Sequence, residues 1–323
     1  MKRHLLFLAA LLIVNLAASA QKKFSVYAVG FYNQENLFDT CHDEGKKDYE
    51  YLPNKGWNGM KYTNKLRNMS KALADMGTDV LPNVGCAFIG LSEVENHKVL
   101  DALVDQAPLK ARNMKYVHIE GPDRRGIDCA LLYNPSLFSV KNVKLLPYVQ
   151  ELAKDSAFFT RGFLTVRGEM AGDDVAVIVC HWPSRFSGPF YRESAARQVK
   201  VIKDSLLNVN QEMKIFVMGD MNDDPVNKSM HVYLQAKPEI SQVGAGDMYN
   251  PWYNVLAKEG KGTLFYSGNW NLFDQIVMTP NLLNKDAKKK DYSSLKYWKN
   301  HIFRRDYLIQ QEGQYKGAPL RTT

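Results

Sequence analysis

The stretch from residue 115 to residue 180 constrains the fold most, because strand-like runs follow one another there without a helix between them. Residues 127–133, 162–169 and 175–180 are rich in β-branched and aromatic residues, as strands are. A simple alternating fold would place a helix after each strand. The sequence therefore argues against an all-parallel sheet and favours mixed sheets.

Four more strand-like runs and three helical patterns complete the expected elements. The strand-like runs are residues 24–32, 87–94, 215–219 and 273–278. Apolar residues spaced three and four apart predict helices over residues 62–76, 99–104 and 193–207. This mixture is typical of a layered α/β sandwich. The chain contains no internal repeat and no Pro/Ser-rich linker, so we expect one domain from about residue 24 onward.

The first twenty residues follow a different pattern. Lys2 and Arg3 precede the apolar run 5–16, and small residues continue to Ala20. This is the pattern of a cleavable signal peptide. The run is shorter than the roughly 20 residues that a transmembrane helix needs. We expect cleavage after Ala20, a secreted or periplasmic chain of residues 21–323, and no stable membrane insertion afterwards.

Charge and cysteine content restrict the partners. The net charge of +8 is compatible with a phosphate-bearing substrate, and equally with a solvated basic surface. Cys41, Cys86, Cys129 and Cys180 lack CxxC spacing, which argues against a zinc site. Export would permit disulfides. However, Cys129 and Cys180 lie in apolar strand-like runs, so we expect mostly free, buried thiols.

Acidic and amide residues stand at the ends of two predicted strands. Glu93 ends the run 87–94, where α/β sheets place ligand sites, and carboxylate oxygens suit Mg²⁺. Asn33 and Glu35 are two residues apart, so both can face a metal or a phosphate. A strand-ending turn is the alternative for this pair. Glu95 is expected to begin the next helix.

Asp220 and Asn222 follow the run 215–219, also two residues apart. The carboxylate could orient or deprotonate a water molecule, and the amide could hold a phosphate. An EF-hand calcium loop is the alternative. It does not fit, because Pro225 and Val226 replace its glycine turn and no closing Glu follows.

His181 ends another predicted strand, and Ser184 and Arg185 follow it in a turn. Its imidazole could donate to a phosphoryl oxygen or transfer a proton, or it could be structural. Asp274 interrupts the last predicted strand. A carboxylate buried there needs a donor such as a histidine.

Asp128 opens an apolar strand-like run after a charged turn. If buried, its carboxylate needs a partner. Arg124 or Arg125 could be that partner, or either could contact a phosphate in bidentate fashion. The sequence leaves both interpretations open.

In chain order, six segments resemble the endonuclease/exonuclease/phosphatase family, the DNase I-like phosphoesterases. They read Tyr-Asn-x-Glu-Asn, Ser-Glu-Val, Arg-Gly-Ile-Asp, His-Trp-Pro-Ser-Arg, Gly-Asp-Met-Asn-Asp and Phe-Asp-Gln-Ile, within residues 24–278. No single segment is decisive, but the ordered set is specific. The resemblance implies a four-layered α/β sandwich of two mixed β-sheets flanked by helices, with a site at the open edge of the sheets.

The resemblance also implies roles for the matching residues. Glu93 is the expected principal Mg²⁺ ligand and Glu35 an auxiliary one, with Mn²⁺ or Ca²⁺ as substitutes. His181 is expected to bind or protonate the phosphoryl group, and Asp220 to act as general base. Asn222 and Asp274 are expected to support catalysis. Four further residues are expected to bind the substrate, namely Asn33, Arg125, Ser184 and Arg185.

One motif of the family has no match in this chain. In the family, a Ser-Asp-His motif opens the last core strand, and the acid that Asp274 matches orients its histidine. After Asp274 the only histidine is His301, and no Asp precedes it. We expect a truncated chain that lacks the final strand. Substitution by His301 is the alternative.

The expected reaction is metal-assisted in-line attack of water on a phosphate ester. We expect a monomeric phosphodiesterase, most simply a nuclease, whose partner is its phosphate-ester substrate. Two alternatives stay open. One is an inositol-phosphate or sphingolipid-type phosphatase or phosphodiesterase on the same fold, and the other is an inactive exported protein with a phosphate-binding remnant.

Overall fold

The computed structural model describes residues 24–151, 158–286 and 288–320. The expected signal peptide, residues 1–20, lies outside the described residues. Within the described ranges, no helix combines the length and the apolar character that crossing a bilayer requires.

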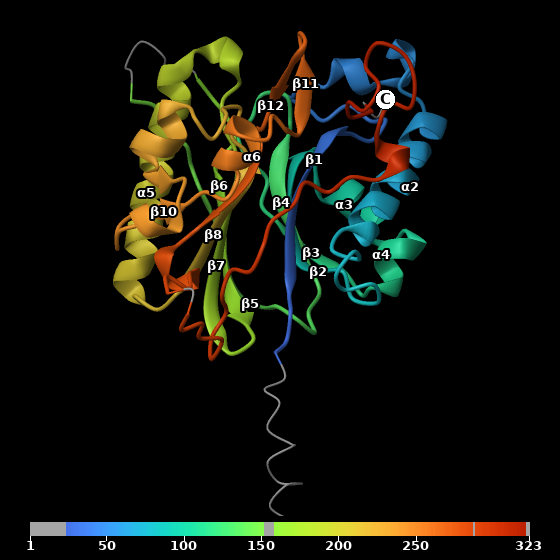
Figure 1. Ribbon diagram of the computed structural model, residues 1–323. Coiled ribbons are helices and arrows are strands. Elements are labelled where there is room, and N and C mark those ends of the chain that lie inside the picture. The colour runs from blue at the N-terminus through green and yellow to red at the C-terminus, as the bar shows by residue number, and fades with distance from the viewer. Residues whose placement is uncertain (1–23, 152–157, 287, 321–323) are drawn as a thin grey trace, which may run out of the picture.

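Two mixed sheets lie face to face in the middle of the protein (Figure 1). The first has the strand order β1-β2-β4-β3. Its strands are β1 (Ala28–Leu37), β2 (Cys86–Val94), β3 (Lys115–His118) and β4 (Asp128–Tyr133). β1 and β2 are parallel, whereas β4 is antiparallel to both β2 and β3.

The second sheet has the order β5-β6-β7-β8-β13-β10-β9. Its strands are β5 (Ser139–Leu146), β6 (Phe163–Met170), β7 (Asp173–His181), β8 (Lys214–Asp220), β9 (Ala236–Lys237), β10 (Met248–Tyr249) and β13 (Asp274–Met278). β7 and β8 are parallel, and β13 is antiparallel to β8. A separate hairpin joins β11 (Leu264–Tyr266) to β12 (Asn269–Asn271).

Helices cover the outer face of each sheet (Figure 1). On the first sheet these are α2 (Gly59–Asp75), α3 (His97–Val104) and α4 (Ala107–Ala111), and on the second α5 (Pro189–Val209). The short α6 (Tyr253–Ala257) precedes the hairpin. Side-chain caps from Asn58 and Asn96 fix the starts of α2 and α3, since each amide oxygen accepts from backbone N–H groups of the first turn.

Three separate apolar clusters divide these elements into four layers. Strand β7 contributes side chains to two of these clusters. Val175 and Val177 face the other sheet, whereas Ala176 and Ile178 face α5, because successive side chains of a strand point to opposite faces. The clusters confirm the expected four-layered sandwich.

Strand β1 differs from its prediction at both ends. It begins at Ala28, not at residue 24, and it continues to Leu37 through the polar motif. Its register against β2 shifts between Asn33 and Leu37, where Glu35 and Asn36 have positive φ values of 49° and 61°. Bulges of this kind re-aim side chains. The motif is therefore a distorted strand end.

The cysteines agree with the prediction. Cys86, Cys129 and Cys180 are buried free thiols, and Cys41 is an exposed one. Burial raises the pKa of Cys86 and of Cys180 to about 12, so both stay protonated and act as small apolar side chains.

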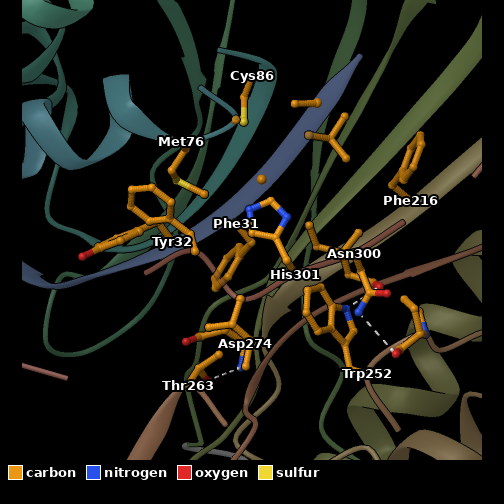
Figure 2. A pocket seen from close by; sticks show the side chains of 18 of the residues that line it. Phe31, Tyr32, Met76, Cys86, Phe216, Trp252, Thr263, Asp274, Asn300 and His301 are labelled. Atoms are coloured by element: carbon orange, nitrogen blue, oxygen red, sulfur yellow. Dashed lines mark hydrogen bonds between the residues drawn. The ribbon is translucent and has the colours of Figure 1, made fainter. Parts of the chain in front are cut away.

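Strand β1 has an open edge. Among the described residues its only neighbouring strand is β2, and a groove of about 1970 Å³ runs along its other side. Figure 2 shows Phe31 and Met76 on one wall of this groove and Phe216 and Trp252 across from them. The expected further strand stays a prediction.

Candidate active site

Three neighbouring strands of the second sheet carry polar residues at the same end. His181 of β7 lies opposite Asp220 of β8, and Asp220 lies opposite Asp274 of β13. β7 and β8 are parallel, so their carboxyl ends meet at one edge of the sheet. The sheet therefore sets three of the predicted site residues in one row.

The first sheet adds its own polar residues to this row. The Asn33 amide Nδ2 donates to Asp220 Oδ2 at 3.0 Å. Glu93 Oε1 lies 3.9 Å from His181 Nε2, and Asp220 Oδ2 lies at the same distance from that nitrogen. Carboxylates from both sheets thus flank one imidazole.

Left-handed backbone conformations gather at the ends of these strands. Glu35, Asn36, Glu93 and Asn222 have φ values of 49°, 61°, 60° and 48°. Such conformations cost about 1–3 kcal/mol each for residues other than glycine, and they cluster at functional sites. The observed strain supports the view that this edge is a site.

Burial controls the electrostatics of the site. It raises the pKa of Glu93, an effect that Arg125 opposes and Asp220 reinforces. Burial and the charge of Asp220 raise the pKa of Asp274 well above its ordinary value. Burial and two nearby arginines hold the pKa of His181 well below its usual range, so its imidazole is neutral at pH 7. A bound cation would relieve the crowded carboxylates.

The oxygen donors fit a sparsely liganded Mg²⁺. No three His, Cys, Asp or Glu side chains within the described ranges are grouped to enclose a metal ion by themselves. Mg²⁺ commonly binds one or two carboxylates and keeps several waters. Glu93 offers such a carboxylate, and Asn36, whose backbone bonds to Glu93, has a buried Oδ1 without a hydrogen-bond partner in the described structure. Glu35 lines the adjoining groove.

A polar cavity of about 340 Å³ opens beside Glu93 and Asp220. Its other walls present hydrogen-bond donors and two aromatic rings. These come from Arg125, Thr160, Arg161, His181, Ser184, Ser187 and Asn222, and from Phe158 and Phe159. A cavity with carboxylates on one side and donors on the other can hold a metal and an anion next to each other.

Arg161 is a cavity residue that the sequence analysis missed. Its Nη1 lies 3.0 Å from Asp123 Oδ2, and its Nη2 donates to the backbone oxygen of Trp182 at 3.0 Å. Asp123 Oδ1 in turn accepts from the backbone N–H of Arg125 at 2.8 Å. An arginine just before a strand-like run was the available signal, but its buried partner lies on a distant turn.

Asn222 and Arg185 both brace the loop that follows β8. Asn222 donates its backbone N–H to Asp220 Oδ1 at 2.9 Å and its amide to the Trp182 oxygen at 2.9 Å. Arg185 binds Asp224 at 2.8 Å and stacks over Phe273 at 4.4 Å. It does not line the polar cavity, whereas Ser184 and Arg125 do.

Two further polar residues have partners other than the expected ones. Asp128 pairs with His118 Nε2 at 3.0 Å and accepts from the backbone of Gly121, so neither arginine of the turn is its partner. Glu95 does not begin α3. Its Oε2 accepts from the backbone N–H of Asp39 at 2.7 Å, because Asn96 already caps the helix.

His301 lies in the groove beside β1 (Figure 2). Its Nε2 is 3.4 Å from Asp79 Oδ2, so its carboxylate partner is on the surface. Asp274 has a different contact, since its backbone N–H donates to Thr263 Oγ1 at 3.3 Å. The arrangement offers no support for His301 as the second histidine.

A family model described as the Endonuclease/Exonuclease/phosphatase family matches residues 28–323. The chain belongs to this family. The finding confirms the resemblance carried by the six motifs. It also supports, at the level of the family, a hydrolase that acts on phosphate esters.

Solved structures show the same fold. A mannosyl-6-phosphatase from Bacteroides thetaiotaomicron is 13% identical with a TM-score of 0.50, covering 79% of this chain and 86% of its own. An endonuclease/exonuclease/phosphatase family protein from the same organism is 14% identical with a TM-score of 0.50, covering 80% and 84%. Truncated TDP2 from Caenorhabditis elegans is 15% identical with a TM-score of 0.46, covering 67% and 78%. No curated protein matches the chain. The likeness to the two Bacteroides thetaiotaomicron structures confirms the DNase I-like fold.

Proposed function

We propose that the protein is a Mg²⁺-dependent phosphodiesterase that hydrolyses its substrate by in-line attack of water. The observation that carries this proposal is the meeting of Glu93, His181 and Asp220, from both sheets, beside a cavity that two arginines line. Family membership supports the class of reaction.

Glu93 would hold the metal, with Asn36 and Glu35 close by. When bound, Mg²⁺ supplies a Lewis acid for a phosphoryl oxygen and stabilises the leaving oxygen. The buried Glu93 suits this task, because burial disfavours its charge until a cation arrives.

The other residues would act on water and phosphate. Asp220 is oriented by Asn33 and by the backbone of Asn222, and burial raises its pKa, which makes it a better general base. A neutral His181 would donate a hydrogen bond to a phosphoryl oxygen. Arg125 and Arg161 would stabilise negative charge in the transition state. Most of the rate would then come from positioning and charge.

Exposed aromatic rings favour a nucleic-acid substrate. Phe159 lines the polar cavity and is 54% exposed, and Phe186 is 99% exposed between the lining residues Ser184 and Ser187. Aromatic side chains beside a basic groove are stacking platforms for nucleobases. We therefore propose a nuclease in preference to a lipid or inositol-phosphate esterase.

Two expectations from the sequence belong to this proposal. Removal of residues 1–20 would release a monomeric protein outside the cytoplasm. A further strand beside β1 would bring a histidine to Asp274, whose buried carboxylate lines the groove. Without that donor, turnover would be lower by roughly 10²–10³, as for the loss of one oxyanion-hole donor.

A hydrolysis assay tests the proposal. Residues 21–323 should cleave bis-p-nitrophenyl phosphate and nick plasmid DNA with Mg²⁺, and EDTA or Glu93→Ala should abolish both activities. Glu169→Ala, on an exposed ion pair with Lys141, is the matched control and should leave turnover unchanged. Turnover in EDTA would contradict the metal mechanism. Full turnover by Glu93→Ala would contradict the assignment of Glu93 as the metal ligand. Preference for p-nitrophenyl phosphate over the diester would indicate a phosphatase.

A further inference from the structure

Lys65 is a buried lysine on helix α2. It is 3% exposed and lies on the face of α2 that packs against the first sheet, next to Leu66. Lys61 and Lys71 of the same helix are exposed. Lysine is rarely buried without a partner, because an ammonium loses its hydration there. Its position therefore points to a specific task.

The ammonium of Lys65 contacts the distorted end of β1. Nζ donates to the backbone oxygen of Glu35 at 2.5 Å and lies 6.0 Å from the centre of the Trp57 ring. Glu35 is one of the two left-handed residues of the bulge, and Asn36 is the other. Lys65 thus holds the strained peptide from the helix side.

Two sets of hydrogen bonds connect the bulge to carboxylates of the candidate site. The backbone N–H of Glu35 donates to Asn33 Oδ1 at 2.7 Å, and Asn33 Nδ2 donates to Asp220. The backbone of Asn36 bonds to the Glu93 carboxylate. Each set ends on a carboxylate at the centre of the site.

We propose that Lys65 is a positioning residue of the metal site, which fixes the Glu35–Asn36 bulge and through it Glu93 and Asp220. The inference rests on the proposed function, since it concerns the site that would hold Mg²⁺. In this role Lys65 would act through the Glu35 backbone and would not need to touch the metal or the substrate.

A purely electrostatic role for Lys65 predicts the opposite result. Burial lowers the pKa of Lys65 to about 8, and the charges of Glu35 and Glu93 oppose that shift, so the amine is largely protonated at pH 7. A cation that only neutralised these carboxylates would repel a metal, and its removal would tighten metal binding. A positioning cation gives weaker binding when removed, because residues behind the ligands orient them.

Metal binding to the full chain distinguishes these roles. Mn²⁺ binding is measured by the loss of the free Mn²⁺ signal in electron paramagnetic resonance, with circular dichroism to verify folding. Lys65→Met should raise the Kd for Mn²⁺ by about 10–100-fold. Lys71→Met is the matched control, since Lys71 lies 4.0 Å over the exposed Tyr307 ring, and its Kd should be unchanged.

An unchanged or lower Kd in Lys65→Met overturns the proposal. If that variant does not fold, Lys65→Gln decides by the same criterion, because glutamine removes the charge and keeps a hydrogen-bond donor. A wild-type chain that binds no Mn²⁺ overturns the metal site and the role of Lys65 together. Wild-type binding with no effect of either substitution overturns the role of Lys65 alone.

Discussion

The polar cavity and the groove along β1 meet at the same carboxylates but differ in how their charges are satisfied. In the cavity, Arg161 is paired with Asp123, and Arg125 lies 3.8 Å from Glu93. In the groove, the walls are largely aromatic and aliphatic (Figure 2), and the charges that raise the pKa of Asp274 are those of other carboxylates.

This difference indicates which half of the site is organised. Paired, buried side chains such as Arg161 and Asp123 cannot reorient at low cost, so this part of the cavity is preorganised. Among the described residues, the groove has a strand edge without a neighbouring strand on one side, and at its end it has the Asp274 carboxylate, whose neighbouring charges are negative. Substitutions in the cavity should therefore affect stability and chemistry strongly, whereas the groove should respond chiefly to added molecules.

The largest effect is expected for Arg161→Ala. It leaves Asp123, which is 6% exposed, as a lone buried charge, so the free energy of unfolding in urea should fall by about 3–5 kcal/mol. Adding Asp123→Asn should restore most of the stability but not the turnover. Arg167→Ala breaks a partly exposed pair on β6, the strand that follows Arg161, and should cost about 1 kcal/mol or less. Equal losses in the two single variants would show that the cavity is no better organised than the surface.

The next effect compares one histidine of each region. His181→Gln should lower kcat for bis-p-nitrophenyl phosphate by about 10²–10³, as expected for loss of a transition-state donor. His301→Gln should leave kcat unchanged, because His301 pairs with Asp79 on the surface. A loss in the second variant that matched the first would mean that His301 takes part in the reaction.

The smallest effect is expected from free imidazole. It should raise the turnover of the wild type by entering the groove beside Asp274, where we propose that a donor is missing. The gain should stay well below 10²–10³, because an untethered molecule loses translational freedom on binding. Ammonium chloride of equal ionic strength is the control. A gain seen only in His181→Gln would place the missing donor in the cavity.

The sequence predicted the residues that follow long, regular strands. His181 and Asp220 end two continuous apolar runs, which are a local signal, and the parallel pairing of β7 and β8 brings them together. The edge strand β5 was missed, because all of its residues are exposed or half-buried and its apolar alternation is weak. The strands β9 and β10, with two residues each, are too short to carry a pattern.

Features that depend on long-range contacts were not predictable. Arg161 and Asp123 are 38 residues apart, so no spacing indicates their pairing. The bulge in β1 requires left-handed Glu35 and Asn36, a conformation that residues other than glycine rarely adopt. Lys65 looks like an ordinary helical lysine in the sequence, because the backbone oxygen that accepts its hydrogen bond belongs to a residue 30 positions away.

The hydrogen bond from Asn33 to Asp220 has a consequence for the order of folding. It joins residues that are 187 positions apart, and the row of β7, β8 and β13 closes only when Asp274 has paired with Asp220. Contacts of such high sequence separation form late, because the chain loses the entropy of closing a long loop before the contact stabilises it. During synthesis the chain can build either sheet in part before the proposed site is complete. The meeting of Glu93 with His181 and Asp220 should therefore be among the last features to form.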